Sequence, residues 1–168
     1  RFAPEVVAAM NAAVDRLEQR AGAQRLKLVG HSGGGVIAAL PDEAHRFGKR
    51  VASHAQGAPG VKNALRNGVD TIEHGYYIDD ECLALMLDRG AYFVPTIALL
   101  NVFKAAVARP LDMPPWRLRK QLELIAVMET SFRRAVDAGI KIATGPDYFG
   151  APLRAHGDSP DEPIAMVR

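Results

Sequence analysis

Two histidines and an aspartate are the residues of this chain best placed to bind a metal ion. His54 and His74 each end a short apolar run, in VASH and TIEH, and Asp147 ends a third run in IATGPD. Neutral imidazoles and carboxylates are good ligands for zinc and similar divalent ions. An aspartate there can also take a proton from metal-bound water, whose pKa the ion lowers. Any one of these histidines alone is better explained as a hydrogen-bonded interior residue, but the matching positions of all three residues favour a shared metal site.

The segment between the two histidines predicts how they are positioned. It contains GVKNALRNG, a helical stretch closed by Gly68, which suits the left-handed conformation that follows a helix. The unit is therefore strand, helix, strand. A right-handed crossover makes its two strands parallel and puts both histidines at their carboxyl ends. This is the edge where α/β proteins place their chemistry.

Five stretches of the chain share one pattern, in which a glycine ends a helix and a short β-rich run leads to a polar or Gly/Pro turn. They are AGAQRLKLVG, FGKRVASHAQG, NGVDTIEHG, RGAYFVPT and AGIKIATGPD. Helices fill most of the gaps, so we expect an α/β fold of about five βα units with parallel strands. The longer gap, residues 97–138, contains the turn cluster PLDMPP, expected as a loop over the rim, and then one long amphipathic helix.

The order of the strands decides whether all three candidate ligands can meet. If the strands lie in sequence order, His54 and His74 are neighbours. Asp147 then ends a strand two places further on, roughly 10 Å away across a flat sheet, so a common ion requires barrel-like curvature. A curved sheet would give a three-ligand site that keeps an open position for water, and the family resemblance described below implies that curvature. Ser32 and Thr96 would end other strands at the same edge.

Composition narrows the class of protein. The chain has 168 residues, 48% of them hydrophobic and 24% charged, and a net charge of +2, which suits one folded domain. Its basic residues are scattered, so we expect no nucleic-acid partner and no membrane partner. The single cysteine, Cys82, excludes an internal disulfide framework and is expected to be a buried thiol. No secretory signal is present, and we expect a cytoplasmic protein.

The candidate metal ligands lie in motifs that resemble a known family. HAQG, IEHG with the following YYIDDE, and GPD resemble the fifth, sixth and eighth strand ends of the amidohydrolase superfamily. The most similar branch contains imidazolonepropionase-like and Xaa-Pro dipeptidase-like enzymes. RGAYFVPT resembles its seventh strand, and AHGDSPDEPIAMV resembles the loop and helix after the eighth. The resemblance runs from about residue 42 to the end. It implies the carboxyl-terminal half of a (β/α)₈ TIM barrel and hydrolysis of amide or related C–N bonds in a small-molecule or dipeptide-like substrate.

The resemblance also assigns roles to single residues. His54 and His74 match ligands of a divalent metal, for which zinc is expected, and Asp147 matches the aspartate that binds metal and shuttles the proton. Pro146 stands where the family usually has threonine, which removes a backbone donor next to Asp147. The His-x-His pair of the family's first strand does not occur in this chain, so an incomplete site is expected. Lys27 matches the lysine that bridges two metals in many members, although a half-exposed strand residue is the favoured interpretation.

A second resemblance covers residues 2–40. The motif GHSGG resembles the nucleophile elbow of α/β-hydrolases, in the strand–turn–helix context that the elbow requires. Ser32 would be the nucleophile, and the N–H of Gly33 would help to bind the oxyanion. The alternative is a glycine-rich turn with an incidental serine. Asp147 and His156 have the order of a triad, but their surroundings resemble the other family, so a working triad is not favoured.

The two resemblances meet near Leu40 and Pro41, which suggests a chimera or a fragment. We expect a segment 1–40 and a partial barrel 41–168 that pack as one domain. Three hypotheses follow: a metal-dependent amidohydrolase, a serine hydrolase that uses Ser32, and a catalytically silent scaffold. A half-barrel leaves open sheet edges and an uncovered apolar face, so a homo-oligomer is expected.

Overall fold

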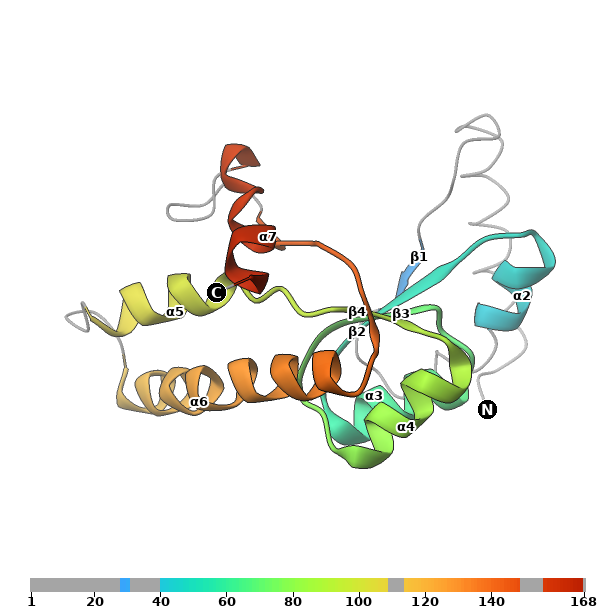
Figure 1. Cartoon of the computed structure of the whole chain (residues 1–168), viewed down its shortest axis with the longest axis horizontal. Helices are drawn as coiled ribbons and strands as arrows, with labels where there is room; N and C mark the ends of the chain where they lie inside the picture. The colour runs from blue at the N-terminus through green and yellow to red at the C-terminus, as the bar shows by residue number, and fades with distance from the viewer. Residues whose placement is uncertain (1–27, 31–39, 109–113, 149–155, 168) are drawn as a thin grey trace.

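The strands form one parallel sheet that positions the site. The computed structural model describes residues 28–30, 40–108, 114–148 and 156–167. Within them, five strands pair in sequence order, each parallel to the next. The strands are β1 (Leu28–Gly30), β2 (Val51–Gly57), β3 (Thr71–Tyr77), β4 (Tyr92–Val94) and β5 (Lys141–Ile142). The predicted α/β fold of about five βα units is confirmed (Figure 1).

Helices follow the strands in the expected alternation. They are α2 (Leu40–Arg46), α3 (Ala58–Arg66), α4 (Asp80–Arg89), α5 (Leu99–Val107), α6 (Pro115–Asp137), the short 3₁₀ helix η2 (His156–Asp158) and α7 (Asp161–Met166). The long helix predicted before Gly139 is confirmed as α6. Helix α5 was not predicted. Pro115, expected in a loop, instead begins α6, with Pro114 as the N-cap residue before it, because proline suits a first helical turn.

The two histidine-bearing strands are longer than predicted. We expected each strand to end at its histidine, but β2 and β3 continue three residues beyond His54 and His74. The pairing of β2 with β3 shifts register between Ala55 and Gly57, which marks a bulge. At His74 the backbone turns into the left-handed region, with φ of 77°. A bulge or a residue with positive φ redirects side chains while the strand continues. The apolar pattern of the sequence does not reveal either feature.

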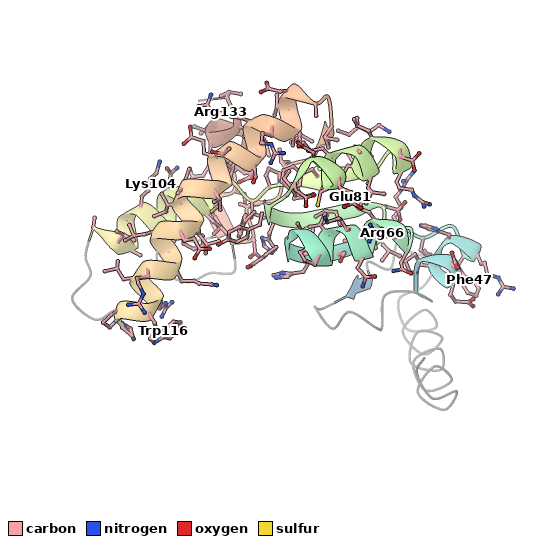
Figure 2. The ribbon with its side chains drawn as sticks, turned by 90° about the horizontal axis from the view of Figure 1, so that it is seen from below. Phe47, Arg66, Glu81, Lys104, Trp116 and Arg133 are labelled. Carbon is pink, nitrogen blue, oxygen red and sulfur yellow. The ribbon has the colours of Figure 1, made fainter. Side chains whose placement is uncertain are left out.

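The first hydrophobic cluster lies between the sheet and helices α3 and α4. Leu65, Ile72, Met86 and Phe93 are each at most 1% exposed in it. Cys82 is also fully buried, as predicted. Figure 2 shows Arg66 of α3 beside Glu81 of α4, and these two side chains form an ion pair across the helices.

The second cluster fastens the carboxyl-terminal ends of β3 and β4 to helices α5, α6 and α7. Its buried members are Tyr76, Ile97, Leu99, Leu100 and Met128. Figure 1 shows α5 beside α6, beyond the end of the sheet, with α7 next to α5. Ser131 of α6 donates a hydrogen bond to the carbonyl of Tyr76 at 2.8 Å. The carboxyl-terminal ends of β3 and β4, next to the candidate site, are therefore packed against helices.

The sheet face opposite α3 and α4 carries polar side chains. Thr71 donates to Glu73 at 2.8 Å, and Lys141 lies 5.4 Å from the centre of the half-exposed Tyr92 ring. These residues alternate with members of the first cluster, so they point away from it. At these positions the expected uncovered apolar face is not present, and the homo-oligomer stays a prediction. No helix among the described residues is long and apolar enough to cross a membrane.

Candidate metal centre

His54 and His74 meet across neighbouring strands. Nδ1 of His54 lies 2.9 Å from Nε2 of His74, and the rings meet edge to face with centroids 4.2 Å apart. The register of β2 and β3 explains this contact, because Ala55 of one strand pairs with His74 of the other. Two of the three metal ligands predicted from the sequence are thus brought together.

A hydroxyl pair fixes the other nitrogen of His74. Nδ1 of His74 lies 3.0 Å from Oγ1 of Thr96 and 3.1 Å from Oη of Tyr76, and these two oxygens are 2.8 Å apart. Thr96 donates its own proton to the carbonyl of Pro95. The Thr96 oxygen can therefore only accept from its neighbours, which places the imidazole proton on Nδ1. The lone pair on Nε2 is then directed toward His54, as a metal ligand requires.

Burial keeps His74 neutral. The residue is 5% exposed, and burial, followed by the neighbouring His54, lowers its pKa to about 4, although Asp147 acts in the opposite direction. Burial also raises the pKa of Tyr76 to about 12, so its hydroxyl keeps its proton. At neutral pH the site therefore presents an uncharged imidazole, the form that binds metal.

The backbone is turned at three residues within or after the strands. His74, Thr96 and Asp147 have φ of 77°, 50° and 55°, and they are the non-glycine residues with positive φ in the described part of the chain. His74 lies within β3, three residues before its end, whereas Thr96 and Asp147 follow β4 and β5 at the same edge of the sheet. Non-glycine residues in this region cost of order 1–3 kcal/mol each and cluster at functional sites. The same edge thus carries the histidine pair and the backbone strain.

Asp147 lies at the same edge as the histidine pair, and its side chain does not contact either histidine through a hydrogen bond or ion pair given by the structure. It is exposed, and it acts on His74 through its charge. Among the described residues no set of three His, Cys, Asp or Glu side chains gathers as a metal site. The turn that leads to Asp147 is tightly packed, because a Cβ on Gly145 would lie 2.8 Å from the side chain of Val94. The assignment of Asp147 as ligand and proton shuttle stays a prediction.

Sequence reasoning missed two buried residues of this region. Tyr76 lies two residues after His74 in the same strand, so period-two spacing could have indicated its nearness. Glu162 is fully buried and accepts hydrogen bonds from the amides of Ile97 and Ala98, and no local motif indicated it. Lys27, Ser32 and Gly33 lie outside the described residues, and so does the side chain of His156.

A cavity of about 510 Å³ lies apart from the histidine pair. Helices α5, α6 and α7 form its walls, and Leu100, Phe132 and Met166 are among its lining residues. Neither histidine lines it. The cavity therefore adds nothing to the metal centre.

Comparison with known proteins decides between the two resemblances. The model of the amidohydrolase family matches residues 28–167. The chain belongs to the amidohydrolase family. This match includes the GHSGG motif and the supposed junction at Leu40 and Pro41, so the α/β-hydrolase resemblance of residues 2–40 is not supported.

Several relatives cover most of this chain with part of their own length. An uncharacterized protein of Mycobacterium tuberculosis is 32% identical over 133 residues, which are 79% of this chain and 35% of that protein. Ochratoxinase of Aspergillus niger is 28% identical over 149 residues, covering 79% of this chain and 30% of the enzyme. This amidohydrolase-family chain thus spans about a third of the curated relatives it matches.

Solved structures place the fold among amidohydrolase barrels. A Xaa-Pro dipeptidase with methionine bound in its active site superposes with a TM-score of 0.74 at 31% identity, covering 92% of this chain and 41% of the other. The A. niger ochratoxinase structure superposes with a TM-score of 0.67 at 26% identity, covering 79% of this chain and 33% of the other. The five-stranded sheet is consistent with part of such a barrel.

Proposed function

We propose that this chain carries part of the active site of a metal-dependent hydrolase that cleaves amide or related C–N bonds in small, dipeptide-like substrates. One observation carries the proposal: Nδ1 of His54 and Nε2 of His74 meet at 2.9 Å, with the His74 ring held by the hydroxyls of Thr96 and Tyr76. Membership of the amidohydrolase family supports the type of reaction. The similarity to a Xaa-Pro dipeptidase and to an ochratoxinase supports a small substrate.

The residues present fit a divalent metal, for which zinc is proposed. His54 and His74 offer two imidazole nitrogens at one point, and the hydroxyls of Thr96 and Tyr76 keep the Nε2 lone pair of His74 available. A divalent ion at this point would supply Lewis acidity toward a carbonyl oxygen and would lower the pKa of water. His54 and His74 would hold it, and Asp147 is proposed as a further ligand from the same edge.

Asp147 is proposed as the group that moves the proton. Its carboxylate takes a proton as the water oxygen bonds to the carbonyl carbon of the substrate. When the C–N bond breaks, Asp147 returns that proton to the leaving nitrogen. The residue suits this role because it is exposed at the edge that carries the histidines and acts on His74 through its charge.

Hydrolysis of a substrate panel tests the proposal. The protein is incubated with zinc, manganese or cobalt and with Xaa-Pro dipeptides and N-acyl amino acids, and the released amine is measured. We expect metal-stimulated release that falls about 100-fold or more in Asp147→Asn. The matched control is Asp88→Asn on α4, an exposed residue outside this edge. Metal binding without hydrolysis of any substrate would favour the silent scaffold instead.

A further inference from the structure

Glu162 is an unusual buried acid. Its side chain on α7 is 0% exposed, and its two carboxylate oxygens accept hydrogen bonds from the amide of Ile97 at 3.0 Å and of Ala98 at 2.7 Å. No ion pair among the described residues neutralises it. A buried carboxylate is costly unless it is well hydrogen-bonded. The hydrogen bonds from the two backbone amides are thus what stabilises the buried carboxylate.

These two amides open helix α5. The helix begins at Leu99, and its N-cap residue Ala98 has no side chain that could cap it. The first N–H groups of a helix lack intrahelical partners, and a carboxylate there both accepts from them and is favoured by the helix dipole. Glu162 therefore caps α5 from a position 64 residues further along the chain.

The capped turn leads directly to the metal centre. Thr96 immediately precedes the two amides and has φ of 50°. Its backbone carbonyl accepts a hydrogen bond from the amide of Leu99 at 3.1 Å. Its hydroxyl lies 3.0 Å from Nδ1 of His74. Contacts thus run from Glu162 through the 96–98 turn to His74 and on to His54.

We propose that Glu162 is a positioning residue of the histidine pair. By holding the 96–98 turn, it keeps the Thr96 hydroxyl against Nδ1 of His74 and so fixes the tautomer that directs Nε2 toward His54. This role rests on the proposed function, because positioning the histidine pair serves metal binding. Both carboxylate oxygens are needed: glutamine in the same place would turn an NH₂ group toward one of the two amides.

The test compares Glu162→Gln with a neighbour on the same helix. In the metal-free 168-residue chain labelled with ¹⁵N-histidine, long-range ¹H–¹⁵N spectra report the His74 tautomer, and hydrogen exchange reports the amides of Ile97 and Ala98. We expect wild-type protein to show the Nδ1–H tautomer. Glu162→Gln should show a mixture of tautomers, with exchange of both amides at least about tenfold faster. The exposed Asp161→Asn should resemble wild type.

Metal affinity gives a second readout. Cobalt affinity should fall about tenfold in Glu162→Gln and stay unchanged in Asp161→Asn, a loss typical of outer residues that orient a ligand. A folded Glu162→Gln protein with the wild-type tautomer and wild-type affinity would overturn the proposal. If Glu162→Gln does not fold, Glu162→Asp, which keeps the charge but is one methylene shorter, is judged by the same criteria. If wild-type protein binds no cobalt, the proposed function fails, while the tautomer still decides the role of Glu162.

Discussion

Nδ1 of His54 and Nε2 of His74 lie 2.9 Å apart, toward the carboxyl-terminal ends of two neighbouring parallel strands. A hydrogen bond of this length holds one proton between the two nitrogens, and a metal ion bound to both nitrogens would displace that proton. His74 is held by hydroxyls on its far side and is kept neutral by burial, so it acts as an acceptor. A proton and a metal ion therefore compete for the same point, and this competition underlies the predictions below.

Replacing His74 by asparagine should separate its hydrogen bond to Thr96 from its role as a metal ligand. The asparagine amide retains a donor near the position of Nδ1, so it can still bond Thr96, and asparagine tolerates the positive φ of 77°. It removes Nε2. We expect zinc affinity to fall at least about 100-fold while the free energy of unfolding changes by less than about 1 kcal/mol. His74→Ala should lose both, with about 2 kcal/mol of stability in addition. Chelator competition and urea unfolding measure the two effects, and unchanged zinc affinity in His74→Asn would argue against Nε2 as a ligand.

Acid should destabilise the metal-free protein through His74. Its pKa is about 4 in the folded protein, below the ordinary value of 6.5. Above pH 6.5 neither the folded nor the unfolded form binds the proton. Between pH 6.5 and 4 the unfolded form binds it and the folded form does not, so the free energy of unfolding falls by up to about 3 kcal/mol as the pH is lowered.

Urea unfolding at pH 7.5, 5.5 and 4.5 measures this loss. The same series on His74→Asn removes the titrating group and leaves the other acids and bases in place. The difference between the two proteins should grow as the pH falls. A constant difference would mean that the imidazole is not kept neutral by the fold.

The hydroxyl of Thr96 should matter more than its shape. Thr96→Val keeps the volume but removes the oxygen that lies between His74, Tyr76 and Pro95. Because these partners are buried, we expect a loss of about 2 kcal/mol in stability and a mixture of His74 tautomers. Thr96→Ser, which keeps the oxygen, should lose less than about 1 kcal/mol. Equal effects of the two substitutions would show that packing, and not the hydroxyl, is what the site requires.

Gly75 should be intolerant of any side chain. Its φ is 52°, and a Cβ there would lie 2.6 Å from the ring of Phe93, inside the first hydrophobic cluster. Gly139 has φ of 77° with nothing within 4 Å of a built Cβ, so it provides a control for backbone strain alone. We expect Gly139→Ala to cost about 1 kcal/mol and Gly75→Ala at least about 3 kcal/mol. Unfolding curves that place both variants at the same stability would show that the Phe93 contact relaxes freely.

Much of the fold could be predicted because its signals are local. Gly68 and Gly90, each expected at the end of a helix, both take the left-handed conformation there. The β-rich runs that follow these glycines form parallel strands, as predicted. The pairing of His54 with His74 followed from their equivalent positions in the repeat. The extension of β2 and β3 beyond these histidines did not, because a bulge and a positive φ have no signature in apolar spacing.

Helix α5 shows why the remainder could not be predicted. Its start carries no capping side chain at Ala98, since the cap comes from Glu162 in a distant helix. A single sequence gives no sign of such a partner. The two-family hypothesis is not supported, because it rested on a five-residue motif around Ser32 that lies within the residues matched by the amidohydrolase family.

Cobalt titration of the 168-residue chain tests the central claim most directly, because bound Co²⁺ absorbs visible light according to its ligands. We predict that one ion binds per chain with imidazole coordination, and that binding is lost in the double variant His54→Gln, His74→Asn. His45→Gln, which changes a surface histidine bonded to Asp70, should bind as wild type does. Absence of a bound ion in wild-type protein, or binding that survives the double variant, would contradict the account.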